Sequence, residues 1–275
     1  MTDEAASIRG PLYAEALGST DAPAMVFVHP NPMDGTSWLF QMAHFSTWYR
    51  CIAVDLPGYG RSPRAGPGLT MREVAAACWR AVDARGGTTP SVLVGCSVGA
   101  AVVQHMYHLR PAATDIVVLC GTGWWESKEF AHRHIAAYRQ EGVGYRRRFT
   151  LGDFSEAFRT TPLAAWFASL FAERNAAADV ETIINLLTAH AVPDPAWLQA
   201  ELRAPVLLVS GGMDNSHPAA IRLRDRLPEV EMVTIEDAGH ACHMEQPWAF
   251  DRAVISFLRR RGHLHLPDVD ALVAG

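Results

Sequence analysis

A serine stands between two glycines in the segment SVLVGCSVGAA, residues 91–101. Residues 95–99, GCSVG, match the pattern G-x-S-x-G, in which a tight turn from a strand to a helix presents the serine hydroxyl above a sheet. Glycine is needed on both sides because this turn strains the backbone at the serine and brings the strand and the helix close together. A hydroxyl presented in this way can attack a carbonyl carbon, so Ser97 is the candidate nucleophile.

A serine hydroxyl is a weak nucleophile until a base takes its proton, so this chemistry also requires a histidine. The strongest candidate is His240 in the segment IEDAGHACHMEQPWAF. It follows an apolar run after a short loop, and it precedes a helix whose start is indicated by Pro247. His243 is the rival. Because it lies farther from the end of the apolar run, we expect it to be a structural residue near Glu245.

The third residue of such a site is an acid that fixes the tautomer of the imidazole and stabilises the imidazolium. Asp214 fits because it follows an apolar run and a glycine turn in PVLLVSGGMDNSHP, and Glu126 in CGTGWWES is the alternative. The order serine, acid, histidine along the chain is typical of sites built on a G-x-S-x-G turn. The helix after Ser97 begins at the site, so the backbone N–H of Val98 is available to a developing oxyanion.

These residues must be positioned by a sheet, and six short apolar runs without polar alternation predict strands that are buried on both faces. Helical patterns lie between the runs, which predicts the α/β class: a mostly parallel open sheet of about six to eight strands flanked by helices. The strands are expected at residues 24–29, 51–55, 91–95, 115–120, 205–210 and 231–235, and the helices at residues 71–85, 98–109, 219–227 and 247–261.

One long segment contains amphipathic helical patterns and no convincing strand. We therefore expect residues 1–124 and 204–275 to form the core and residues 125–203 to form an inserted helical cap. Aromatic side chains of the cap either wall a pocket or join the cap to the core. They are Trp125, Phe149, Phe154, Trp166, Phe167 and Phe171, of which Trp125 and Trp166, together with His29 of the core, are the candidate substrate-binding residues.

Five motifs in order carry a resemblance to the α/β-hydrolase-fold serine hydrolases, which extends over about residues 24–258. The resemblance implies an α/β-hydrolase fold, a catalytic triad of Ser97, Asp214 and His240, and a cap over the pocket. The motifs are HPNP at 29–32, DLPGYGRS at 55–62, GCSVGA at 95–100, GGMDNSHP at 211–218 and AGHACHMEQPWAF at 238–250.

The HPNP motif departs from the pattern of this family. Members usually have His-Gly after the first core strand, and the N–H of the next residue is the second oxyanion donor. Pro30 has no N–H to donate, so the role passes to Asn31. HPNP also resembles the HGNP of haloalkane dehalogenases, but those enzymes carry aspartate where this chain has Ser97, so halide displacement is disfavoured.

Two further motifs have a structural and a functional interpretation. Asp55 in DLPGYGRS lies near the expected site, and we expect it to shape the loop rather than to take part in catalysis. One of Arg146, Arg147 and Arg148 could bind a substrate carboxylate. Three consecutive residues of a helix cannot all face inward, so at least two of the arginines are expected to be solvated.

Composition excludes several other classes of function. A net charge of −5 and a pI near 6.2 provide no basic surface for nucleic acid. No apolar run approaches about 18 residues, so no membrane span is expected. The N-terminus carries early acids and no secretion signal, which favours a cytoplasmic location. The five scattered cysteines predict reduced core residues without metal-ligand spacing, and no motif for a metal or another cofactor is present.

Three functions fit these motifs. The first is hydrolysis of a small, fairly apolar carboxylic ester or lactone, a small-molecule substrate, through an acyl-enzyme. The second is cleavage of a carbon–carbon bond in a diketone-like substrate by the same triad. The third is a slow-turnover ligand receptor that signals through its cap. The sequence leaves the oligomeric state open.

Overall fold

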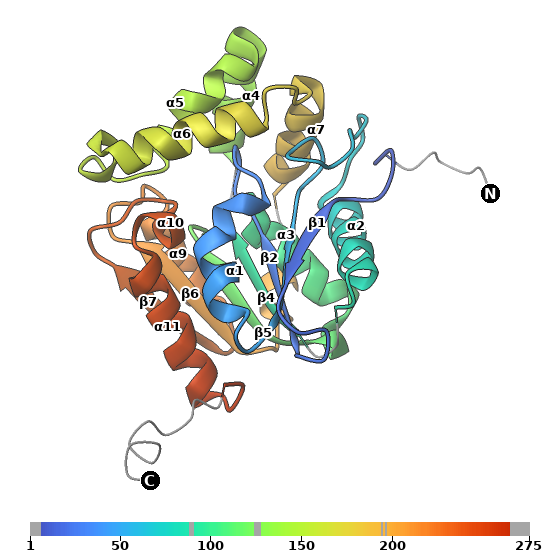
Figure 1. Cartoon of the computed structure of the whole chain (residues 1–275), viewed down its shortest axis with the longest axis vertical. Coiled ribbons are helices and arrows are strands. Elements are labelled where there is room, and N and C mark those ends of the chain that lie inside the picture. The colour runs from blue at the N-terminus through green and yellow to red at the C-terminus, as the bar shows by residue number, and fades with distance from the viewer. Residues whose placement is uncertain (1–6, 88–90, 124–127, 194, 196, 265–275) are drawn as a thin grey trace, which may run out of the picture.

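The computed structural model describes residues 7–87, 91–123, 128–193, 195 and 197–264. They form one seven-stranded sheet with helices on both faces and further helices above one edge (Figure 1). The strands are β1 Ala14–Leu17, β2 Ala24–Val28, β3 Arg50–Val54, β4 Ser91–Cys96, β5 Thr114–Cys120, β6 Val206–Gly211 and β7 Val230–Ile235. The helices are α1 Leu39–Phe45, α2 Met71–Ala84, α3 Val98–Leu109, α4 Glu129–Glu141, α5 Tyr145–Gly152, α6 Pro162–Arg174, α7 Val180–Ala191, α8 Trp197–Ala200, α9 His217–Arg224, α10 Cys242–Glu245 and α11 Pro247–Arg260.

The strands lie in the order β1-β3-β2-β4-β5-β6-β7. Every neighbouring pair is parallel except β1 and β3, which are antiparallel. The chain runs from β2 to β3 on one side and reaches β4 on the other, so the winding direction changes between β2 and β4. In open α/β sheets the crevice at such a switch point, outside the carboxyl ends of the strands, is where ligands bind.

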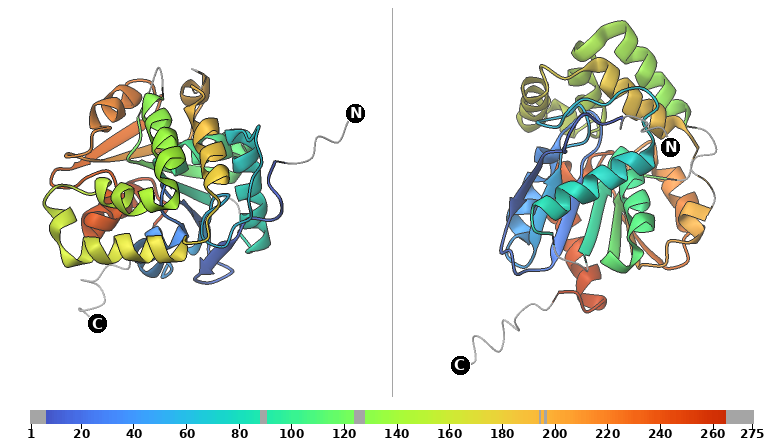
Figure 2. Two further views of the ribbon diagram at one scale, coloured as in Figure 1. Left: turned by 90° about the horizontal axis from the view of Figure 1, so that it is seen from above. Right: turned by 90° about the vertical axis from the view of Figure 1, so that its right-hand side faces the viewer.

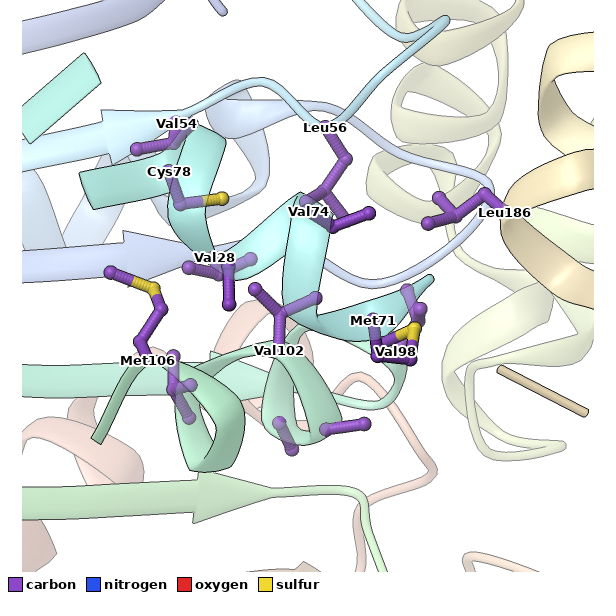
Figure 3. Close-up of a cluster of buried hydrophobic side chains, with 14 of the residues drawn as sticks. Val28, Val54, Leu56, Met71, Val74, Cys78, Val98, Val102, Met106 and Leu186 are labelled. Carbon is purple, nitrogen blue, oxygen red and sulfur yellow. The ribbon is translucent and has the colours of Figure 1, made fainter. Parts of the chain in front are cut away.

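The two faces of the sheet bury alternate residues of the same strands. In β2, Val26 and Val28 pack toward α2 and α3, whereas Met25 and Phe27 pack toward α1 and α11. Figure 3 shows side chains of α2 and α3 meeting Val28 and Val54 of the sheet. This burial on both faces explains why the strands read as unbroken apolar runs, and it confirms the predicted fold class.

Helices α4, α5, α6 and α7 lie over the edge of the sheet from which the carboxyl ends of the strands emerge (Figure 1, Figure 2). They come from the segment between β5 and β6. Helix α7 is anchored to the core by Leu186, which lies near Leu56 (Figure 3). Division of the chain into a core and a cap at residues 125 and 203 stays a prediction.

The sequence prediction missed β1 and the short helices α1, α8 and α10, and it shifted one helix. β1 is a four-residue edge strand that is only partly buried, so it lacks a continuous apolar run. Helix α9 begins at His217, two residues before the predicted start at residue 219, and ends at Arg224. Within the described ranges, no helix is both long enough and apolar enough to cross a bilayer.

Candidate active site

Ser97 occupies a strained turn between β4 and α3. Its backbone has φ 56° and ψ −119°, and it is the only non-glycine residue with positive φ among those the structure describes. Its N–H donates a hydrogen bond to the Cys120 carbonyl, 3.0 Å away, which ties the turn to the neighbouring strand β5. Strain of this kind persists only where the surrounding structure enforces it, and it is common at functional sites.

The two glycines beside Ser97 are required by close backbone contacts. A Cβ atom at Gly95 would lie 2.3 Å from the Gly99 carbonyl oxygen. A Cβ atom at Gly99 would lie 2.2 Å from the Val28 carbonyl oxygen, on the neighbouring strand β2. Both distances are too short for any side chain, which confirms the reason for glycine that the sequence analysis gave.

Asp214 and His240 come from the loops after β6 and β7 and form a hydrogen-bonded pair. The His240 Nδ1 atom lies 3.0 Å from Asp214 Oδ2. Asp214 is almost fully buried and also accepts hydrogen bonds from the backbone N–H of Ser216 at 2.8 Å and from its hydroxyl at 2.5 Å. These contacts fix the carboxylate, which in turn orients the imidazole ring and favours the tautomer with a proton on Nδ1.

The pair also perturbs both pKa values. Burial acts to raise the pKa of Asp214, but the charge of His240 and the hydrogen bonds from His240 and Ser216 outweigh it and lower the pKa to about 2. Burial acts to lower the pKa of His240, but the charge and hydrogen bond of Asp214, followed by the charge of Asp153, raise it to about 9. The site therefore favours a protonated, positively charged imidazole.

Ser97, Asp214 and His240 border one cavity of about 1390 Å³. Asn31 and Val98 border it as well, and neither of their backbone N–H groups donates a hydrogen bond to another described residue. No hydrogen bond joins the Ser97 hydroxyl to the His240 ring in the described part of the chain. Without substrate such hydrogen bonds are often long, and they tighten when substrate binds.

This arrangement agrees with the comparison of the chain with known families, in which residues 25–250 match the profile of the alpha/beta hydrolase family. The chain belongs to the alpha/beta hydrolase family. The resemblance in the sequence motifs is thereby confirmed at the level of the family and its fold.

Among proteins similar in sequence, the polyketide synthase ThaQ of Burkholderia thailandensis is 30% identical over 267 residues. The match covers 94% of this chain but only 13% of ThaQ. Among solved structures, an enol-lactonase from Burkholderia xenovorans superimposes with a TM-score of 0.82 at 20% identity, over 92% of this chain and 99% of that one. A thermophilic esterase from Thermogutta terrifontis has a TM-score of 0.78 at 24% identity, over 92% and 97%. These structural likenesses show the alpha/beta hydrolase fold.

Two predicted substrate-binding residues do not border the cavity of this alpha/beta hydrolase. His29 is fully buried, its Nδ1 donates to the Pro30 carbonyl at 2.8 Å, and its Nε2 accepts the Leu56 N–H at 2.9 Å. Both ring nitrogens are occupied, so His29 supports the loops instead of binding substrate. Trp166 lies on α6, is 50% exposed, and stays outside the cavity lining. Trp125 and Glu126 lie outside the described residues.

The rival histidine is structural, as expected, but its contacts differ from the prediction. His243 is fully buried and stacks on Trp38, with ring centroids 4.1 Å apart. Burial, together with the charge of His240, lowers its pKa to about 3, so the ring is neutral. Glu245, its predicted neighbour, instead accepts hydrogen bonds from Ser155 and Gly239.

The expectations for Asp55 and for the arginine run are confirmed. The Asp55 carboxylate accepts hydrogen bonds from the backbone N–H groups of Gly35 at 2.8 Å and Arg61 at 2.9 Å, so it shapes two loops. Arg147 and Arg148 are exposed, whereas Arg146 is buried.

Of the predicted cap aromatics that the structure describes, three pack in a cluster with residues from outside the segment between β5 and β6, and two border the cavity. Phe154, Phe167 and Phe171 pack in one buried cluster with Met244 of α10. Phe149 and Phe154 contribute to the cavity wall. The prediction therefore contained both roles, but the sequence did not distinguish between them.

The cysteines are free and buried, as predicted. Three potential metal ligands lie close together beneath the site. The sulfur atoms of Cys96 and Cys120 and a ring nitrogen of His243 are within 4.8 Å of one another, a spacing at which they could hold a metal ion. Metal binding needs thiolates, however, and burial raises the pKa of the Cys96 thiol. We therefore assign these three side chains to the core beneath the site.

Sequence reasoning missed one buried acidic residue of the cavity. Asp153 follows α5 and borders the same cavity as His240. Its neighbours in the sequence, TLGDFSEAF, form no recognised motif. Only the packing of the helices between β5 and β6 against the rest of the fold brings this carboxyl group to the site.

Proposed function

We propose that this chain is a serine hydrolase that cleaves small, fairly apolar carboxylic esters or lactones. The observation that carries the proposal is the hydrogen bond between His240 and Asp214 beside a serine held in a strained strand-to-helix turn, with all three residues on one cavity. A nucleophile, a base and an acid that orients the base are the parts that acyl transfer requires.

In the first half of the reaction, the Ser97 oxygen attacks the carbonyl carbon of the ester. His240 takes the hydroxyl proton on Nε2, the ring nitrogen that does not face Asp214, and the carbonyl electron pair moves to oxygen. The backbone N–H groups of Asn31 and Val98 are suited to donate hydrogen bonds to this oxyanion because they border the cavity and have no other acceptor among the described residues. The tetrahedral intermediate then expels the alcohol, which receives the proton from His240.

In the second half, water replaces the alcohol. His240 takes a proton from the water as its oxygen attacks the acyl carbon, and the imidazolium then returns the proton to Ser97 when the acid leaves. Asp214 stays ionised throughout and stabilises the imidazolium of each step. Its low pKa supports this role.

Part of the cavity wall supports a small, fairly apolar substrate. Apolar side chains in its wall include Val98, Phe149, Phe154 and Leu187, and these suit an acyl chain or a lactone ring. The printed names of the structural relatives, an esterase and an enol-lactonase, agree with this substrate class.

A panel of chromogenic esters and lactones tests the proposal. We expect the wild type to hydrolyse at least one short acyl ester and Ser97→Ala to lose at least about 10³-fold of kcat, since a triad without its nucleophile retains little activity. Ser46→Ala is the matched control because that hydroxyl donates only to the Ala43 carbonyl at the end of α1. Circular dichroism checks folding. Equal hydrolysis by wild type and Ser97→Ala would refute the proposal, and turnover of a vinylogous diketone in place of every ester would favour carbon–carbon cleavage.

A further inference from the structure

Asp153 differs from every other buried carboxylate that the structure describes. Five other carboxylates are buried, and each accepts hydrogen bonds from at least two described residues. No hydrogen bond from a described residue reaches Asp153, whose Oδ2 atom is buried. The five other buried carboxylates are Asp34, Asp55, Asp214, Glu245 and Asp251.

The position of Asp153 is well defined although its carboxylate has no hydrogen-bond partner among the described residues. Its carbonyl oxygen accepts the N–H of Ala241, 2.9 Å away, so the residue is bonded directly to the loop that carries His240. Glu245 joins the same two segments because it accepts hydrogen bonds from the N–H of Ser155 and from the N–H of Gly239, each at 3.0 Å.

The approach of these segments leaves no room for a side chain between them. A Cβ atom at Gly239 would lie 2.6 Å from the backbone nitrogen of Ser155. The residue at 153 is thus fixed against the histidine loop, and it is only 7% exposed. Buried polar groups are almost always hydrogen-bonded, so a buried carboxylate without a partner among the described residues calls for a donor from a ligand or solvent.

The cavity is the place where the Asp153 carboxylate can meet a hydrogen-bond donor. It borders the cavity together with Ser97 and His240, and the charge of His240 influences its carboxyl group. Burial raises the pKa of Asp153 to about 7, against the opposing effect of His240. A hydrogen bond from a ligand would offset the free-energy cost of burying the ionised carboxylate, without any movement of the backbone.

We propose that Asp153 is a specificity-determining residue that accepts a hydrogen bond from the substrate, and that the preferred substrates are esters or lactones with a hydroxyl or amide N–H group near the scissile carbonyl. This inference rests on the proposed function and adds a substrate class to it. A neutral donor fits better than an ammonium group because Arg133 and Arg147 border the same cavity.

Pairs of substrates that differ only in the donor group test this inference. The panel contains nitrophenyl esters with a hydroxyl or acetamido group at carbon 2, 3 or 4 of the acyl chain, each beside its counterpart without that group. We expect the wild type to prefer at least one donor substrate by tenfold or more in kcat/KM, because a site built to bind a donor discriminates against analogues that lack it.

Substitution of Asp153 must remove that preference selectively. In Asp153→Ala and Asp153→Leu, which differ in size so that packing effects can be separated, we expect the ratio within the preferred pair to fall to about twofold or less. Loss of the Asp153 charge also lowers the pKa of His240 and so changes hydrolysis of both members of a pair, but this change cancels in their ratio. Glu156→Leu is the matched control because Glu156 borders the same cavity but is exposed. This control should keep the preference.

Two outcomes would overturn the inference. One is equal kcat/KM within every pair for the wild type, and the other is a preference that survives in both Asp153 variants. Binding of the same pairs to Ser97→Ala, measured by calorimetry, separates this inference from the proposed function. If no ester is hydrolysed but donor ligands still bind at least tenfold more tightly in an Asp153-dependent way, the proposed function fails and the role of Asp153 stands.

Discussion

Substitution of Asp214 by asparagine should change both the plateau value and the pH dependence of kcat/KM. His240 can take a proton from Ser97 only when its ring is neutral, so kcat/KM of the wild type should rise with pH through a pKa of about 9. The shift from the ordinary value of 6.5 corresponds to about 3 kcal/mol in favour of the imidazolium. Most of this comes from the charge and the hydrogen bond of Asp214, and a smaller part from Asp153.

Asp214→Asn removes the larger part of that stabilisation. We expect the rising limb of the pH profile to move down by about two pH units, since burial of the ring then opposes protonation. We also expect the plateau to fall by about 10⁴-fold, because an amide neither holds the required tautomer nor stabilises the imidazolium.

The two effects oppose each other at neutral pH. At pH 7 a histidine with a pKa of about 9 is neutral in about 1% of molecules. A lower pKa therefore increases the fraction of molecules with a neutral His240 by up to about 10²-fold. The loss caused by Asp214→Asn should therefore be only about 10²-fold at pH 7 but about 10⁴-fold near pH 10.

The assay is ester hydrolysis between pH 5.5 and 10.5, followed with a pH-stat so that ionisation of a chromophore does not interfere. Asp237→Asn is the matched control because Asp237 is an exposed acid on the same loop as His240. That variant should retain the profile of the wild type. An apparent pKa that is the same in Asp214→Asn and in the wild type would refute the electrostatic reasoning.

Two further substitutions probe the framework of the site. Gly99→Ala places a Cβ atom 2.2 Å from the Val28 carbonyl oxygen, so we expect loss of activity and at least about 3 kcal/mol of destabilisation in urea unfolding. Gly66→Ala meets its nearest atom at 3.8 Å and should change little; equal effects would contradict the steric argument. Glu245→Ala leaves the N–H groups of Ser155 and Gly239 without their acceptor. It should destabilise the protein by about 2–4 kcal/mol, whereas an unchanged unfolding midpoint would show that this carboxylate does not join the two loops.

The six parallel strands could be predicted from the sequence because burial on both faces leaves an unbroken apolar run, as in SVLVGC of β4. β1, with the sequence AEAL, pairs only with β3 at the edge of the sheet and carries an exposed side chain. A strand of this kind has no apolar run to reveal it. The fold class was therefore predictable, but its edge was not.

Residues at the carboxyl ends of strands could be proposed as neighbours because parallel strands end at one edge of a sheet. Ser97, Asp214 and His240 follow β4, β6 and β7 and do border one cavity. Contacts made by the helices between β5 and β6 could not be predicted, because they depend on how these helices dock on the sheet. For this reason the sequence does not reveal that Trp166 lies outside the cavity lining or that Asp153 borders the cavity.

The central claim is that the hydroxyl of Ser97, activated by His240, forms a covalent bond with the substrate. Incubation with a nitrophenyl phosphonate ester, followed by intact-protein and peptide mass spectrometry, tests this claim most directly. We expect one phosphonyl group per chain, located on Ser97, formed rapidly by the wild type and very slowly by His240→Ala. Turnover of esters by a protein that carries no label, or a label on another residue of the cavity, would contradict it.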